Sequence, residues 1–145
     1  MTRSVSRLNA FFLIFQIPFY DSYEPGAQFK LYCDDKKCVL EKDRAFISDR
    51  LNGVFDNLIE IDGVIKGNLS GWEIDRIARA DLAAIRLAVY EMLIEGKTPL
   101  KVSVNEAVEI AKNYGTDDSG QFVNGILRSV YELASNRPDD ANADG

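Results

Sequence analysis

One expected helix, at residues 81–95 (DLAAIRLAVYEMLIE), is apolar on most of its circumference. Such a helix is usually the buried centre of a bundle, because only neighbours on several sides can remove that surface from water. Asp81 stands where it would cap the start, Gly96 ends the helix, and Thr98-Pro99 makes a turn. The apolar positions are Leu82, Ile85, Leu87, Ala88, Val89, Met92 and Leu93.

The stretch that follows, residues 99–127, predicts two further helices. Ser103 and Glu106 form an S-x-x-E capping box, in which each side chain satisfies a backbone N–H at the helix start. Tyr114-Gly115 is predicted to close this helix, because glycine adopts the left-handed conformation at little cost.

The next helix is expected to begin near Asp117 and Asp118, where the helix dipole favours carboxylates. Carboxylate pairs such as this one could act as an acid and a base, but their place at a helix start favours capping. Because the connection is short and polar, we expect it to present residues to a partner.

The N-terminal residues predict a helix from about Val5 to Ile17 that Pro18 ends. A basic start followed by AFFLIFQIPF also resembles a signal peptide. Gln16 and Pro18 interrupt the apolar run and no A-x-A-like cleavage site follows, so a buried helix is favoured. Its apolar face comprises Leu8, Phe11, Phe12 and Phe15.

The rest of the chain is also helical or irregular, and no segment has the pattern of a strand. A short helix is expected near residues 27–33 and a long one over 43–69, and the S-G-W-E box at 70–73 opens another. The prediction is an all-α domain over residues 1–135, with about seven helices in two packed three-helix sub-bundles. The sub-bundles are expected at roughly 1–69 and 70–135, with a disordered acidic tail at 136–145.

The amino-acid composition excludes several classes of function. The chain has 17 basic and 23 acidic residues, a net charge of −6, and no histidine. The charge argues mildly against nucleic-acid binding, and the missing histidine excludes Ser-His-Asp triads and histidine metal sites. Cys33 and Cys38 are a weak metal or disulfide signal and are expected to be reduced cysteines in a loop. No nucleotide or metal motif is present, so we expect neither an enzyme nor a cofactor.

Two motifs resemble those of a known family. The run KVSVNEAVEIAKNYGTDDSGQFVNGIL, preceded by AAIRLAVYEML, resembles the signature of the NusB family. The pattern R-x-x-A-x-x-x-x-F-Q, from Arg7 through Ala10 to Phe15 and Gln16, is similar to that family's first helix. The resemblance covers nearly the whole chain, but residues 20–45 carry little of it.

The resemblance implies a cytoplasmic transcription antitermination factor without catalytic activity. Members of the family bind boxA, a single-stranded segment of nascent RNA, together with NusE, a small-subunit ribosomal protein. The pair helps to assemble an antitermination complex on RNA polymerase, chiefly for ribosomal RNA operons. Single-stranded RNA is held by cations along its backbone and by aromatic rings on which bases stack.

The resemblance also implies site residues. Lys112 is a further candidate for a phosphate contact. Arg3 and Arg7 have the alternative of being solvated at a frayed terminus, and Phe15 and Phe122 of being core residues. The implied RNA-binding residues are Arg3, Arg7, Phe15, Gln16, Lys101, Asp118 and Phe122, and the implied partner-binding residues are Asp75 and Asp81.

The chain departs from the family in its charge. It has two N-terminal arginines where members often have three or four, and Gln121 where a lysine is common. We therefore expect weak binding to RNA alone, strong dependence on NusE and a shallow salt dependence. The alternative is a protein-only adaptor or homodimer with weak or lost RNA binding. NusB-like domains fused to RNA methyltransferases are a further class, but no Gly-rich cofactor loop is present.

Overall fold

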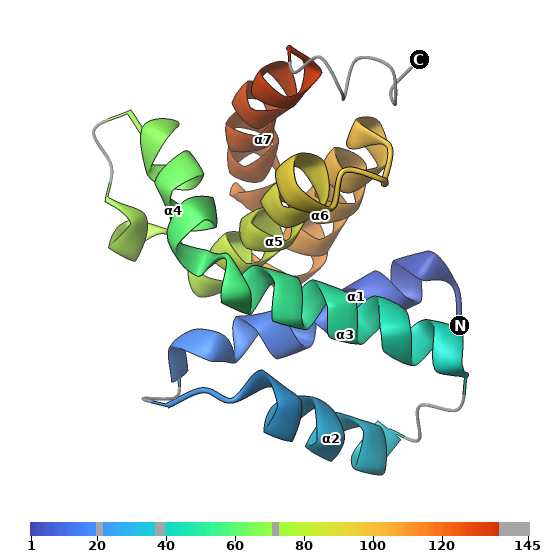
Figure 1. The fold of residues 1–145 in the computed structure, drawn as a ribbon. Coiled ribbons are helices and arrows are strands. Elements are labelled where there is room, and N and C mark those ends of the chain that lie inside the picture. The colour runs from blue at the N-terminus through green and yellow to red at the C-terminus, as the bar shows by residue number, and fades with distance from the viewer. Residues whose placement is uncertain (20–21, 37–39, 71–72, 137–145) are drawn as a thin grey trace. The chain divides into compact units, whose positions relative to one another are not determined.

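The computed structural model describes residues 1–19, 22–36, 40–70 and 73–136, and every regular element in them is helical. This confirms the predicted all-α fold (Figure 1). Shorter helical turns are Ile17–Phe19, Ile74–Arg76 and the π-helical turn Tyr90–Glu95. The α-helices are α1 (Arg3–Phe15), α2 (Pro25–Lys36), α3 (Glu41–Asp56), α4 (Leu58–Gly67), α5 (Arg79–Val89), α6 (Leu100–Tyr114) and α7 (Ser119–Ser135).

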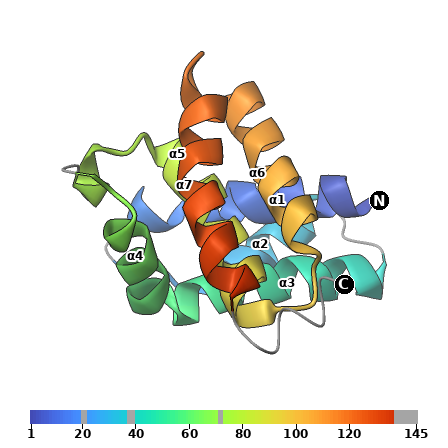
Figure 2. The same ribbon diagram turned by 90° about the horizontal axis from the view of Figure 1, so that it is seen from above.

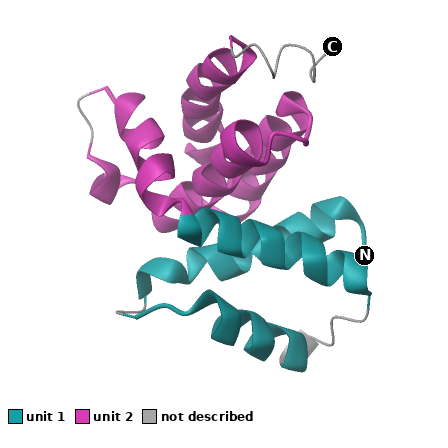
Figure 3. Ribbon diagram, viewed as in Figure 1, with its two compact units in different colours: residues 1–56 teal, residues 57–145 magenta. Residues whose placement is uncertain are grey.

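The chain divides into two compact units, residues 1–56 and 57–145, coloured separately in Figure 3. In the first unit α3 packs against both α1 and α2. The hydroxyl of Thr2 accepts a hydrogen bond of 3.1 Å from the N–H of Val5 and so caps α1. Phe11 and Ile14 of α1 are buried, as expected for an amphipathic helix packed in a core.

In the second unit α5 contacts α4, α6 and α7. The apolar sequence of α5 thus has the bundle-centre position predicted for it, and its buried residues include Ile85 and Leu87. Gly96 ends the π-helical turn with φ of 71°, the left-handed conformation that favours glycine. Helices α6 and α7 lie side by side (Figure 2).

The long helix expected over residues 43–69 is two helices. Asn57 interrupts it with φ of −115° and ψ of 21°, and the boundary between the two units falls there and not near residue 69. Asparagine is a poor helix former because its amide competes for nearby backbone groups. Gly63 lies within α4, where an added Cβ would meet nothing within 4 Å.

The predicted capping box at Ser103 is wrong. Helix α6 begins earlier, at Leu100, and Ser103 lies inside it. The hydroxyl of Ser103 instead donates a 3.2 Å hydrogen bond to the carboxylate of Glu91, which is fully buried in the π-helical turn. A buried carboxylate requires such donors, so Ser103 ties α6 to the end of the central helix.

Two other predicted helix N-termini also differ from the structure. Only a three-residue 3₁₀ turn, Ile74–Arg76, follows the S-G-W-E box, whose Gly71 and Trp72 lie outside the described residues. Helix α5 begins at Arg79, so Asp81 lies in its first turn and does not cap it. The predicted tail, apart from Asn136, lies outside the described residues as well.

Candidate nucleic-acid interface

The turn between α6 and α7 contains Gly115, a position at which no larger residue fits. Gly115 has φ of −104° and ψ of −151°, so it is not in the predicted left-handed conformation. A Cβ at this position would lie 2.7 Å from the Cβ of Ser119 and 2.8 Å from the carbonyl oxygen of Ala111. Gly115 therefore closes α6 by allowing the start of α7 to approach the end of α6.

Ser119 holds the other side of the turn. Its hydroxyl, which is buried, accepts a 2.8 Å hydrogen bond from the N–H of Thr116. Asp118 occupies the position before α7, as predicted, but its side chain makes no capping bond. The backbone of Asp118 is in the helical region and not in the extended conformation typical of a capping residue. Its carboxylate is consequently exposed to solvent.

A cavity of about 190 Å³ lies beside this turn within the second unit. It brings together three of the residues predicted from the sequence, namely Asp81, Asp118 and Phe122. Phe122 is half-buried, so part of its ring is available to a ligand. The described residues that line it are Arg76, Ile77, Ala78, Asp81, Thr116, Asp118, Ser119 and Phe122.

Asp81 is the cavity residue with an unsatisfied polar atom. It is only 6% exposed, yet its Oδ1 has no hydrogen-bond partner among the described residues. A buried acceptor without a donor costs about 1–3 kcal/mol. A bound group that carries an N–H or O–H donor would remove that cost.

The remaining predicted residues of the second unit lie outside this cavity. Lys101 is exposed on α6, and Asp75 lies in the hollow of about 360 Å³ that Lys66, Glu73 and Ile74 complete. Lys112 packs its side chain close to Gly120 and ends 3.7 Å from the carboxylate of Glu109.

Sequence reasoning missed Arg76, an exposed cation that lines the cavity. Its position three residues before Arg79 gives no signal of that role.

In the first unit, the two N-terminal arginines meet one aromatic ring. The guanidinium groups of Arg3 and Arg7 lie 4.5 and 5.3 Å from the ring centroid of Phe46, and that of Arg50 lies 3.8 Å from it. Arg3 is exposed, whereas Arg7 is 4% exposed and therefore not a solvated terminal residue. Cation–π contacts of this kind hold guanidinium groups in place. Phe46 and Arg50 are one turn apart on α3, a spacing that the sequence analysis did not use.

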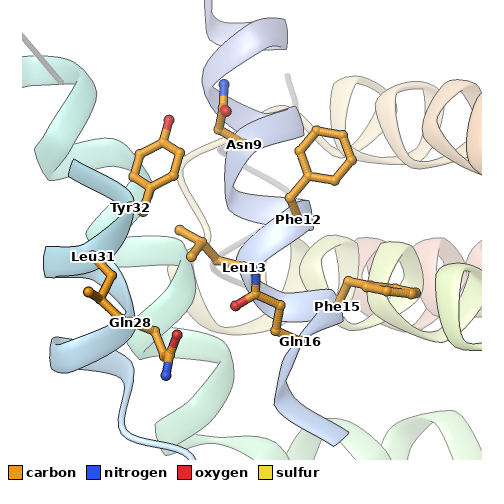
Figure 4. A pocket seen from close by; sticks show the side chains of 8 residues that line it. All are labelled: Asn9, Phe12, Leu13, Phe15, Gln16, Gln28, Leu31 and Tyr32. Carbon is orange, nitrogen blue, oxygen red and sulfur yellow. The ribbon is translucent and has the colours of Figure 1, made fainter. Parts of the chain in front are cut away.

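Phe15 and Gln16 lie elsewhere in the first unit. Both are half-buried, and both line a groove of about 610 Å³ between α1 and α2 (Figure 4). Phe15 is thus neither a full core residue nor a freely exposed platform.

The described part of the chain was predicted to have no metal site, and its side chains and helices are as follows. It contains no group of three or more cysteine, aspartate or glutamate side chains arranged to hold a metal ion. None of its helices is long and apolar enough to cross a bilayer. Cys33 lies on α2 and not in a loop, and Cys38 lies outside the described residues.

Known proteins resemble this chain over most of its length. A profile of the NusB family matches residues 4–132. The transcription antitermination protein NusB of Agathobacter rectalis is 43% identical over 127 residues, which are 88% of this chain and 97% of that protein. The chain therefore belongs to the NusB family.

Solved structures agree with the fold. NusB of T. maritima is 33% identical and superposes with a TM-score of 0.81, covering 91% of this chain and 92% of that one. A structure of antitermination factors NusB and NusE in complex with double-stranded RNA gives a TM-score of 0.81 at 25% identity. That similarity covers 90% of this chain and 96% of the other.

Proposed function

We propose that this protein is a transcription antitermination factor that binds boxA-type single-stranded RNA together with NusE. It then helps to assemble the antitermination complex on RNA polymerase, chiefly for ribosomal RNA operons. The observation that carries the proposal is the likeness, over 90% of the chain, to a NusB solved with NusE and double-stranded RNA. The role is that of an RNA-binding adaptor in the cytoplasm and not of an enzyme.

The residues around the turn support this role by their chemistry. Phe122 supplies a ring on which a base stacks, a contact generally worth about 1–3 kcal/mol per base. The unpartnered Oδ1 of Asp81 accepts a hydrogen bond from the bound partner, and Arg76 contacts phosphate. Asp75 and Asp81 are the proposed contacts to NusE.

The exposed cations Arg3, Lys101 and Arg76 complete the proposed RNA contacts. Arg7 acts differently, since it is buried against Phe46 and steadies the start of α1. Phe15 and Gln16, at the end of α1 in the first unit, are further proposed RNA contacts.

Antitermination itself is tested by transcription in vitro through a terminator placed downstream of a boxA sequence. With RNA polymerase, NusE and the other elongation factors present, addition of this protein is expected to raise the fraction of transcripts that pass the terminator. A template with a scrambled boxA is the control. Equal read-through on the two templates would contradict the proposed function.

Asp118→Asn is expected to strengthen RNA binding by a few-fold. The exposed carboxylate lies in the cavity with Phe122, where it repels phosphate. Asparagine is as good as aspartate before a helix, so the stability of α7 is retained. A filter-binding titration measures the change, and equal or weaker affinity would show that no phosphate passes close to Asp118.

The salt dependence of RNA binding is expected to be shallow. Each phosphate contact to a single strand contributes a slope of about −0.7, so three exposed cations predict a slope of about −2. Arg3→Ala should reduce this slope by about 0.7. Titrations at several salt concentrations measure both values. A much steeper slope for the unmodified protein would mean that further cations contact the RNA.

A further inference from the structure

The described residues that bound the groove between α1 and α2 all belong to the first unit. Figure 4 shows Phe12 and Phe15 at one edge and the α2 side chains at the other, with Leu13 and Gln16 between them. Leu13 is 3% exposed and forms the floor, whereas Phe12 is 39% exposed. The α2 residues are Gln28, Leu31 and Tyr32.

The described residues that line this groove carry no charge, but several of them can form hydrogen bonds. Asn9, Gln16 and Gln28 each carry a carboxamide, which offers a donor and an acceptor in one plane, and Tyr32 carries a phenol. Carboxamides pair with the edges of nucleobases, and aromatic rings stack on their faces. The ring of Tyr32 is itself backed by that of Phe29, whose centroid lies 6.3 Å away in a stacked arrangement.

We propose that this groove binds a nucleobase of single-stranded RNA, so that α2 contributes a second RNA subsite. The proposal rests on the proposed function, because it extends that interface from Phe15 and Gln16 across to Gln28 and Tyr32. The base stacks against Tyr32, and the carboxamides of Gln16 and Gln28 hydrogen-bond its edge.

The size and lining of the groove favour a base over a protein surface. A volume of about 610 Å³ is in the range of sites that take a small ligand or a nucleoside. A protein partner or a second copy of this chain would have to bury about 1,200 Å² or more in total. Three carboxamides in so small a site suit the many polar atoms of a base better than an apolar side chain.

The test is a thermodynamic cycle between protein and RNA. Single abasic nucleotides are placed along a boxA-type RNA with several flanking nucleotides, and affinities with NusE present are measured for the unmodified protein and for Tyr32→Leu. At one position, removal of the base is expected to weaken binding to the unmodified protein by about fivefold or more. The same removal should have little further effect on Tyr32→Leu, because contacting groups are not additive.

Two other variants show whether the effect of Tyr32→Leu comes from loss of the ring or from loss of stability. Tyr32→Phe keeps the ring and should bind nearly as well as the unmodified protein. Gln28→Glu places a charge in the groove without altering its shape and should weaken binding several-fold, even if Tyr32→Leu proves unstable. Gln28 is half-buried, so this change leaves the core intact.

The possible outcomes separate this inference from the proposed function. If the RNA binds the unmodified protein, Tyr32→Leu and Gln28→Glu with equal affinity, the groove is not a subsite and the proposed function stands. If no RNA binds in any condition, both fail. If RNA affinity is unchanged but Tyr32→Leu abolishes a dimer seen by light scattering, the groove is a surface for self-association and the inference is overturned.

Discussion

Phe122→Asp is expected to weaken binding of a boxA-type RNA by about 100-fold or more. The change removes a stacking ring, worth about 1–3 kcal/mol for one base, and adds a carboxylate where phosphate approaches. Asp81 and Asp118 already line the same cavity, so the new charge adds to two existing ones. Fluorescence anisotropy with a labelled RNA, in the presence of NusE, measures the loss.

A control variant in the same helix shows whether the loss of binding comes from the position of the new charge or from the charge itself. Leu133 is 49% exposed on α7 and does not line the cavity, so Leu133→Asp adds the same charge elsewhere. Its RNA affinity should be close to that of the unmodified protein, and Phe122→Tyr, which keeps a ring, should bind within a few-fold. If Phe122→Asp folds and binds RNA as well as Leu133→Asp does, Phe122 is not an RNA contact.

Gly115→Ala is expected to lower the free energy of unfolding by about 1–3 kcal/mol, the usual cost of forcing an extra methyl group into a packed site. The added Cβ would collide with Ser119 and with the carbonyl oxygen of Ala111. Relief of the clash moves the start of α7 and breaks the hydrogen bond from Thr116 to Ser119. Urea denaturation followed by circular dichroism measures the change.

Gly125→Ala is the matched control for this prediction. Gly125 lies inside α7, and a Cβ there would meet nothing within 4 Å. Alanine is the better helix former, so this variant should gain about 0.5–1 kcal/mol. Equal stability of Gly115→Ala and the unmodified protein would mean that the turn relaxes without cost.

Strong local patterns were reliable guides to the fold. The helix at 81–95 was predicted to be central because almost all its faces are apolar, and α5 does contact three other helices. Gly96 was predicted to end it, and its left-handed backbone explains why glycine stands there. In both cases the residues concerned determine the structure without reference to distant parts of the chain.

Patterns whose outcome depends on side-chain contacts with other residues failed. Ser103 has the spacing of a capping box, but its hydroxyl bonds to Glu91, twelve residues earlier, because that buried carboxylate needs a donor. Gly115 is required by the proximity of Ser119 and not by its own backbone angles. Neither Glu91 nor Ser119 carried a signal that sequence spacing alone could have used.

The candidate site was foreseen in part. Asp118 and Phe122, one turn apart, were expected to lie together, and Asp81 joins them because α5 begins beside the α6–α7 turn. Arg50 and the carboxamide of Gln28 on α2 were missed, because only the packing within the first unit brings them near α1.

The most direct test of the proposed function is the affinity of a labelled boxA-type RNA with and without NusE, at two salt concentrations. We expect weak binding by the protein alone, much tighter binding with NusE, and only a small loss at the higher salt. Absence of RNA binding in both conditions, with NusE still bound, would contradict the proposal. The protein would then be an adaptor that keeps the NusB fold without the nucleic acid.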